Sequence, residues 1–383
     1  MNFFTKVDIP ATGTNIDYTS RLVFFGSCFA DNISAQFASR KFKVLANPFG
    51  TVYNPLSIAK QIKAIADVKV FGEDDVFQDM RSGIGAASSA KGECAATWFS
   101  WDAHGSLSGK TQDECIAKLN AASLEAREFL QKADVVFITL GTAFVYFLKS
   151  IRENREKSSE TAHGQVVSNC HRQDPRLFER RMISVDEAAA AIQEIVQGLC
   201  KIKNDRILRS AQDDARAENR GLHIVFTVSP LRHMSDGAHG NNLSKATLQL
   251  AIDKAVHEIA SPGSHAPLGV SVARNDVRIN PAPIISYFPS YEIVMDELRD
   301  YRFYESDMIH LSKTAEEYIF ERMAEAYCDE KTRNDIKQVE KFLKSANHRI
   351  QDANSPATAA FLQKLHTEAQ KLERQIAGLE LNV

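Results

Sequence analysis

The positions of apolar residues along the chain predict strands that alternate with helices. Short, mostly apolar runs lie at 22–25, 43–46, 135–140 and 224–228. Each run is followed by turn residues. Runs of this length are typical of strands buried on both faces. Between them, apolar residues recur every three or four positions, as at Phe29, Ile33 and Phe37, which is the spacing of an amphipathic helix. The alternation predicts a parallel sheet covered by helices on both faces.

Three stretches interrupt this pattern, and a fourth follows it. Residues 71–112 hold Gly and Ser clusters and predict a lid-like insertion or a small antiparallel excursion, while 149–182 read as polar and irregular. Residues 203–220 are rich in charge and predict an exposed surface insertion. From about residue 330 the pattern is helical, divided by Pro356. We therefore expect one domain over 1–328 and a helical C-terminal extension over 329–383.

Composition and charge narrow the class of protein. The chain has 383 residues, 44% of them hydrophobic, and its 46 basic and 49 acidic side chains give a net charge of −3. That balance argues against a nucleic-acid partner, and no apolar run reaches the roughly 20 residues of a membrane-spanning helix. The first residues show no signal peptide, so we expect a cytoplasmic protein. Six scattered cysteines without a CxxC pair favour free thiols, and we expect neither a metal nor another cofactor.

The residues that follow the strands are the candidates for chemistry, because parallel sheets bind ligands at the carboxyl ends of their strands. Ser27 and Cys28 stand side by side between the first strand and its helix. A nucleophile there lies in the field of a helix N-terminus, which stabilises a thiolate or an alkoxide. The plainer alternatives are that Ser27 only caps the helix and that Cys28 is a small buried hydrophobe.

A second motif supplies a base. Asp307 precedes His310 by three residues on a turn into a helix, so the carboxylate can orient the imidazole as a general base. Arg232 and His233 follow a strand end and are expected either to bind a substrate anion or to form surface salt bridges. His104 is expected to line a substrate groove or to pack against its aromatic neighbours.

At this point the sequence resembles a known family. Gly26-Ser27-Cys28-Phe29-Ala30 is similar to the signature of the GSCFA family, bacterial proteins grouped with the SGNH (GDSL-like) hydrolases. Supporting motifs are NPFGTVYNP at 47–55, LGTAFVY at 140–146, TVSPLRH at 227–233, NLSK at 242–245 and the Asp307 to Ser312 stretch. The resemblance spans roughly residues 20–325. It implies a three-layer α/β/α flavodoxin-like SGNH hydrolase fold and ester hydrolysis.

The resemblance also assigns roles. SGNH enzymes carry four blocks, and Asp307 with His310 matches the last of them. Gly50 matches the second block, whose backbone N–H donates to an oxyanion. In the third block the usual Asn is missing, and Gly141 or Thr142 would have to donate in its place.

The first block leaves the nucleophile open. Aligning Gly26 with the family glycine puts Cys28 at the nucleophile position, whereas a shift of the turn by one residue keeps Ser27. A thiolate favours acyl transfer through a thioester, and a serine favours a plain esterase.

These observations predict an esterase or deacylase that acts on an O-acyl group of a small molecule or carbohydrate. Two rivals stay open. One is an acyltransferase that uses the same residues with a deep apolar acceptor site, and the other is a ligand-binding module with an incomplete oxyanion hole. Nothing in the pattern predicts the oligomeric state.

Overall fold

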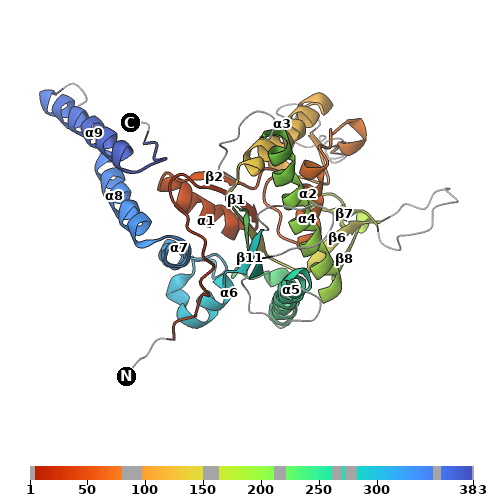
Figure 1. Cartoon of the computed structure of the whole chain (residues 1–383). Coiled ribbons are helices and arrows are strands. Elements are labelled where there is room, and N and C mark those ends of the chain that lie inside the picture. The colour runs from red at the N-terminus through yellow and green to blue at the C-terminus, as the bar shows by residue number, and fades with distance from the viewer. Residues whose placement is uncertain are drawn as a thin grey trace.

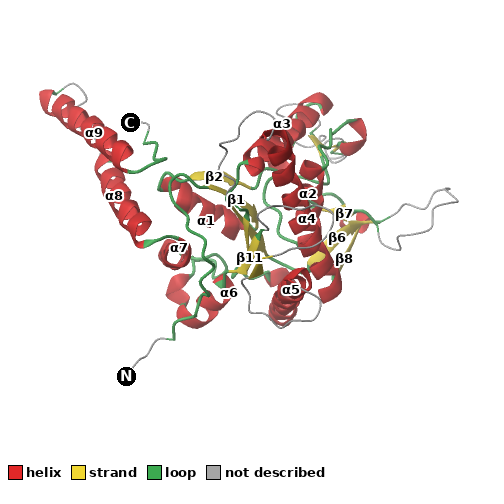
Figure 2. Ribbon diagram, viewed as in Figure 1, coloured by secondary structure: helices red, strands yellow, loops and turns green. Residues whose placement is uncertain are grey.

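The computed structural model describes residues 5–79, 97–149, 164–210, 221–260, 270–271, 283–347 and 355–381. The strands are β1 (Arg21–Gly26), β2 (Lys43–Ala46), β3 (Phe77–Gln78), β4 (Trp98–Phe99), β5 (Val135–Leu140), β6 (Phe144–Leu148), β7 (Val166–Val167), β8 (Phe178–Met182), β9 (His223–Val228), β10 (Val270–Ser271) and β11 (Ile284–Tyr287). The α-helices are α1 (Cys28–Ser39), α2 (Pro55–Ala66), α3 (Gln112–Gln131), α4 (Val185–Ser210), α5 (Gly237–Ala260), α6 (Ser290–Glu292), α7 (Lys313–Tyr327), α8 (Glu330–Ala346) and α9 (Pro356–Gln375). Figures 1 and 2 show how these elements are arranged.

The central sheet has the strand order β10-β11-β9-β5-β1-β2. Its neighbours pair in parallel from β11 through β2, and only β10 is antiparallel to its neighbour. Numbered along the chain, the five parallel strands lie in the order 2-1-3-4-5, which is the flavodoxin-like order. The predicted three-layer α/β/α fold is therefore confirmed.

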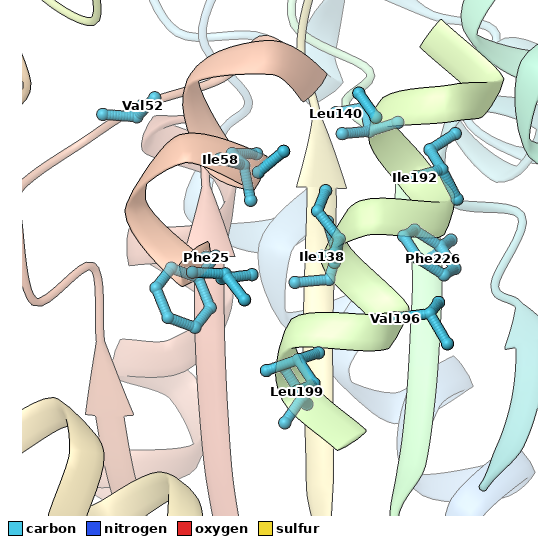
Figure 3. Close-up of a cluster of buried hydrophobic side chains, with 14 of the residues drawn as sticks. Phe25, Val52, Ile58, Ile138, Leu140, Ile192, Val196, Leu199 and Phe226 are labelled. Atoms are coloured by element: carbon cyan, nitrogen blue, oxygen red, sulfur yellow. The ribbon is translucent and has the colours of Figure 1, made fainter. Parts of the chain in front are cut away.

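Alternation along each buried strand divides the core into two layers. In β1, Val23 and Phe25 face one layer while Leu22 and Phe24 face the other. The first layer lies between the sheet and helices α2 to α5; Figure 3 shows Phe25 of β1 and Ile138 of β5 packed in it against α2 and α4. The strands are mostly apolar on both sides because both of their faces are covered.

Helices α1 and α7 cover the opposite face of the sheet. This second layer continues into the C-terminal extension, since α8 and α9 bury Val339, Phe342 and Leu365 in the same cluster. An ion pair between Arg40, which caps the C-terminus of α1, and Glu340 of α8 spans 2.6 Å and joins the extension to the domain. The predicted helical extension is confirmed, and Figure 1 shows it as the blue helices beside α1.

The structure contains a second sheet that the sequence pattern did not predict. β6, β7 and β8 form a three-stranded antiparallel sheet, and β7 and β8 lie within 149–182, the region that reads as irregular. β8 has the sequence FERRM, and only Phe178 in it is buried, so it lacks the apolar run that marks the central strands. Residues 150–163 of the same region lie outside the described residues.

Parts of the two predicted insertions lie within the described residues. In 71–112, β3 and β4 form the expected antiparallel pair, and 80–96 lie outside the described residues. The exposed insertion predicted from residue 203 is wrong for its first residues. There α4 continues to Ser210, and Lys203 is buried with its Nζ donating to the Ala133 carbonyl at 2.6 Å. Residues 211–220 are not described.

Candidate active site

The candidate site lies where the order of the parallel strands reverses. β1 and β5 are neighbours, but the chain leaves β1 toward β2 and leaves β5 toward β9. At such a switch point the loops after the two strands diverge and leave room for a ligand. Ser27 and Cys28 follow β1, and Gly141 follows β5, so the predicted elbow opens at this point.

The elbow is shaped by a glycine. Gly26 has φ +143°, and a Cβ built there would lie 2.3 Å from the carbonyl oxygen of Thr139 on β5. The Gly26 N–H donates to Asn47 Oδ1 at 2.8 Å, and Asn47 Nδ2 donates to Asp31 Oδ1 at 2.6 Å. The Thr51 hydroxyl donates to the other oxygen of Asp31 at 2.9 Å. The loop after β2 is thus hydrogen-bonded both to Gly26 at the end of β1 and to Asp31 in the first turn of α1.

The two candidate nucleophiles have opposite surroundings. Ser27 is only 4% exposed, and its buried Oγ has no hydrogen-bond partner. It stands at the N-cap of α1 without a side-chain cap bond, so the alternative that its hydroxyl caps the helix is wrong. Cys28 is the first residue of α1 and is exposed, so the alternative of a buried hydrophobe is also wrong.

The environment of Cys28 favours the protonated thiol. Although the residue is exposed, partial desolvation of the thiol by its surroundings raises its pKa most, the Asp31 carboxylate raises it further, and the backbone N–H of Cys28 itself lowers it less. The expected stabilisation of a thiolate by the helix N-terminus is therefore outweighed. A Cys28 nucleophile would need a base to remove its proton.

Asp307 and His310 form the expected pair. His310 Nδ1 lies 2.6 Å from Asp307 Oδ2, while Asp307 Oδ1 accepts the backbone N–H groups of Ile309 and His310 at 2.9 Å each. The His310 side chain is the first cause that lowers the pKa of Asp307, to about 2. His310 Nε2 makes no hydrogen bond to any residue that the structure describes, and the side chain is about half exposed. The imidazole is thus oriented with one nitrogen available.

The pair stands beside the elbow helix. α7, which begins three residues after His310, packs against α1, and Asn32 of α1 donates to Glu316 of α7. Leu311 and Phe29 share the second core layer. No hydrogen bond joins His310 to Ser27 or Cys28 within the described ranges. Their approach in a reaction is therefore part of the proposal below.

The groups expected to hold an oxyanion have other acceptors. The Gly50 N–H donates to the Asn47 carbonyl at 2.7 Å, and the Gly141 N–H donates to the Tyr53 carbonyl at 2.7 Å. The Thr142 N–H also points to Tyr53, at 3.3 Å. The Thr142 hydroxyl is buried against Ser244 and accepts the Phe144 N–H. These three residues hold loops together rather than present free donors.

The comparison with protein families bears on the whole of this region. The GSCFA family profile matches residues 21–323, a range that contains the elbow, the switch point and the Asp307–His310 pair. The chain belongs to the GSCFA family. No curated protein and no solved structure matches it significantly.

In this GSCFA chain the predicted substrate-binding residues lie in different settings. Arg232 is exposed, has no ion-pair partner in the described part of the chain, and lies 5.8 Å from the ring centre of Tyr304, beside the loop that carries His310. His233 packs on Tyr53, with ring centres 5.2 Å apart. Burial, and then the charge of Lys245, lower the pKa of His233 to about 4, so it is neutral at pH 7.

His104 is not a free groove residue. Its Nδ1 accepts the Ser106 N–H at 3.2 Å, and a Cβ at Gly50 would come within 2.2 Å of the His104 Cβ. The residue is exposed, but its ring is bound to its own turn, and its Cβ packs on the glycine of the loop after β2.

Sequence reasoning missed Lys245. It is 1% exposed, and its Nζ donates to the carbonyls of Gly141 at 2.6 Å and Ser229 at 2.7 Å. It thereby joins the turns after β5 and β9. Burial lowers its pKa to about 7. One lysine in a polar stretch gives no periodic signal, and only the NLSK motif marked it.

The described residues contain no group of three or more His, Cys, Asp and Glu side chains placed to hold a metal. Among the histidines and cysteines described, the neighbours Cys170 and His171 do not share a metal-binding group: the His171 ring stacks on Phe99, and its Nε2 lies 2.8 Å from the Ser100 carbonyl. Over the same residues, no helix has both the length and the apolarity needed to cross a membrane.

A cavity of about 330 Å³ opens beside α2, away from the elbow. Its walls include Lys60 and Lys69, whose ammonium groups pair with Asp102 and Asp75. With its charges already paired, it adds no reactive group to the site.

Proposed function

We propose that this GSCFA protein is an SGNH-type ester hydrolase that uses Cys28 as its nucleophile. The observation that carries the proposal is the contrast at the elbow. The thiol of Cys28 is exposed at the first turn of α1, whereas the hydroxyl of Ser27 is enclosed. A substrate carbonyl approaching the switch point meets Cys28 first.

His310 is proposed as the general base. Because the pKa of the Cys28 thiol is raised, the resting group is neutral and its proton has to be taken during attack. Asp307 holds Nδ1, which leaves Nε2 to accept the proton. Apo structures often hold such groups apart until substrate binds.

The reaction then balances in two steps. The Cys28 sulfur bonds to the ester carbonyl carbon, the thiol proton passes to His310, and the carbonyl π electrons move to oxygen. Collapse re-forms the carbonyl and releases the alcohol, which takes the proton from His310. Water, deprotonated by His310, hydrolyses the thioester and restores the thiol.

An O-acyl group on a small molecule or carbohydrate is the proposed substrate. The exposed guanidinium of Arg232, beside the His310 loop, favours a substrate that also carries a negative group. Cytoplasmic location stays a prediction from the sequence.

Hydrolysis of p-nitrophenyl acetate tests the proposal. Cys28→Ala is expected to abolish turnover, Ser27→Ala to retain it, and His310→Ala or Asp307→Asn to lower it by about 10²- to 10⁴-fold. His257→Ala is the matched control, because His257 also pairs with a carboxylate at 3.4 Å but lies on α5.

Equal background rates in all of these proteins would refute the hydrolase. Loss of activity in Ser27→Ala with activity kept in Cys28→Ala would refute the assignment of the nucleophile. Turnover that requires an added alcohol as acceptor, and stops when water is the only acceptor, would identify an acyltransferase that uses the same residues.

A further inference from the structure

The oxyanion expected from the proposed reaction needs a hydrogen-bond donor, and the backbone N–H groups of Gly50, Gly141 and Thr142 already donate to other carbonyls. The N–H groups of Gly141 and Thr142 both point to the same acceptor, the carbonyl oxygen of Tyr53. The loop after β2 therefore lies across the end of β5. Because its carbonyl accepts both N–H groups, Tyr53 also places its side chain at the switch point.

Contacts on both sides fix the Tyr53 ring. A Cβ at Gly141 would lie 2.8 Å from the Cβ of Tyr53, so the glycine allows the ring to stand against the strand end. His233 packs on it, with ring centres 5.2 Å apart. Tyr53 is nevertheless 37% exposed, and its hydroxyl has no hydrogen-bond partner among the residues described. A fixed ring with a free hydroxyl is a preorganised donor.

The loop that carries Tyr53 is bonded to the elbow, because the N–H of the preceding residue, Val52, donates to the Gly26 carbonyl at 3.2 Å. Burial is the largest cause that raises the pKa of the Tyr53 phenol, and negative charge on Tyr146 and on Cys28 adds to it. The phenol thus keeps its proton at neutral pH.

We propose that the Tyr53 hydroxyl donates a hydrogen bond to the oxyanion formed when Cys28 attacks an ester carbonyl. The inference rests on the proposed function and names the group that takes the place of the missing Asn. The Tyr53 proton is not transferred: as the sulfur–carbon bond forms, the carbonyl oxygen gains the electron pair and accepts the hydrogen bond. When the intermediate collapses, the bond weakens again.

Two reactions of the same thiol separate this role from a structural one. Acylation by p-nitrophenyl acetate passes through an oxyanion, whereas alkylation by iodoacetamide does not. Tyr53→Phe keeps the ring contacts and the backbone carbonyl. It is expected to slow acylation of Cys28 by about 10²- to 10³-fold and to leave the alkylation rate at the same pH unchanged.

Tyr146→Phe is the matched control, because Tyr146 on β6 has a similar exposure of 39% and a ring that is also held by neighbours, Phe178 and Arg180. It is expected to leave both rates unchanged. Equal acylation by wild type and Tyr53→Phe, or a parallel fall of acylation and alkylation, would overturn the role of Tyr53 alone. If wild-type Cys28 is alkylated but never acylated, the proposed hydrolase fails, and the oxyanion role fails with it.

Discussion

Gly26→Ala tests the close approach that shapes the elbow. The new Cβ would lie 2.3 Å from the Thr139 carbonyl oxygen, where ordinary contacts are 3.4 Å or more, and φ is +143°. The unfavourable backbone conformation is expected to cost about 1–3 kcal/mol. Overpacking against β5 adds about 1–3 kcal/mol. The free energy of unfolding should therefore fall by about 2–6 kcal/mol, out of roughly 5–15 kcal/mol for a typical domain.

Equilibrium unfolding in urea, followed by tryptophan fluorescence, measures this loss. Two other glycines separate its causes. Gly237 has φ +66° with nothing within 4 Å of a new Cβ, so Gly237→Ala should lose only about 1–2 kcal/mol. Gly72 has open space and no such φ, and Gly72→Ala should change stability by less than about 0.5 kcal/mol. If Gly26→Ala were as mild as Gly72→Ala, the description of the elbow would be refuted.

Three further predictions concern charge and burial near the core. Asp31→Asn removes a carboxylate that raises the pKa of Cys28, so the pH midpoint of Cys28 alkylation should fall; an unchanged midpoint would exclude that influence. Ser27→Ala removes a buried hydroxyl that has no hydrogen-bond partner and should raise the free energy of unfolding by about 1–3 kcal/mol. Ser34→Ala removes a hydrogen-bonded hydroxyl and should lower it by about 1 kcal/mol. Urea titrations that gave the reverse order of stability would contradict this. Burial lowers the pKa of His223, which is 1% exposed, from 6.5 to about 4. Because the unfolded chain then binds the proton first, the stability is complete above pH 6.5 and should fall by about 3 kcal/mol as the pH drops to 4. Urea titrations of His223→Gln should show a smaller loss over the same pH range.

Four of the five parallel strands, β1, β2, β5 and β9, were predictable because burial on both faces leaves a mostly apolar run, whereas β11 (Ile284–Tyr287) was missed. Phe24 and Phe25 point to opposite layers, yet both are buried, so β1 is visible in the sequence without knowledge of its neighbours. β6 and β8 were missed because the sheet they form is half exposed. In β8 the polar Arg180 and Arg181 occupy successive positions, which leaves no apolar run to recognise.

The candidate site was predictable only where its residues are close in sequence. Asp307 and His310 are three residues apart, so the turn that brings them together is local. The interaction of Gly141 with Tyr53 joins positions 88 residues apart, through a loop that crosses from β2 to the end of β5. No local pattern predicts that the Gly141 N–H is already bonded, and the expected oxyanion donors could be checked only in three dimensions.

The most direct test of the account is to find which atom carries the acyl group. Wild-type protein would be mixed with p-nitrophenyl acetate, quenched during the first turnover and digested, and the elbow peptide would be examined by mass spectrometry. The account predicts an acetyl adduct on Cys28 that neutral hydroxylamine removes, as it removes a thioester. An adduct on Ser27, or ester cleavage with no adduct at the elbow, would contradict it.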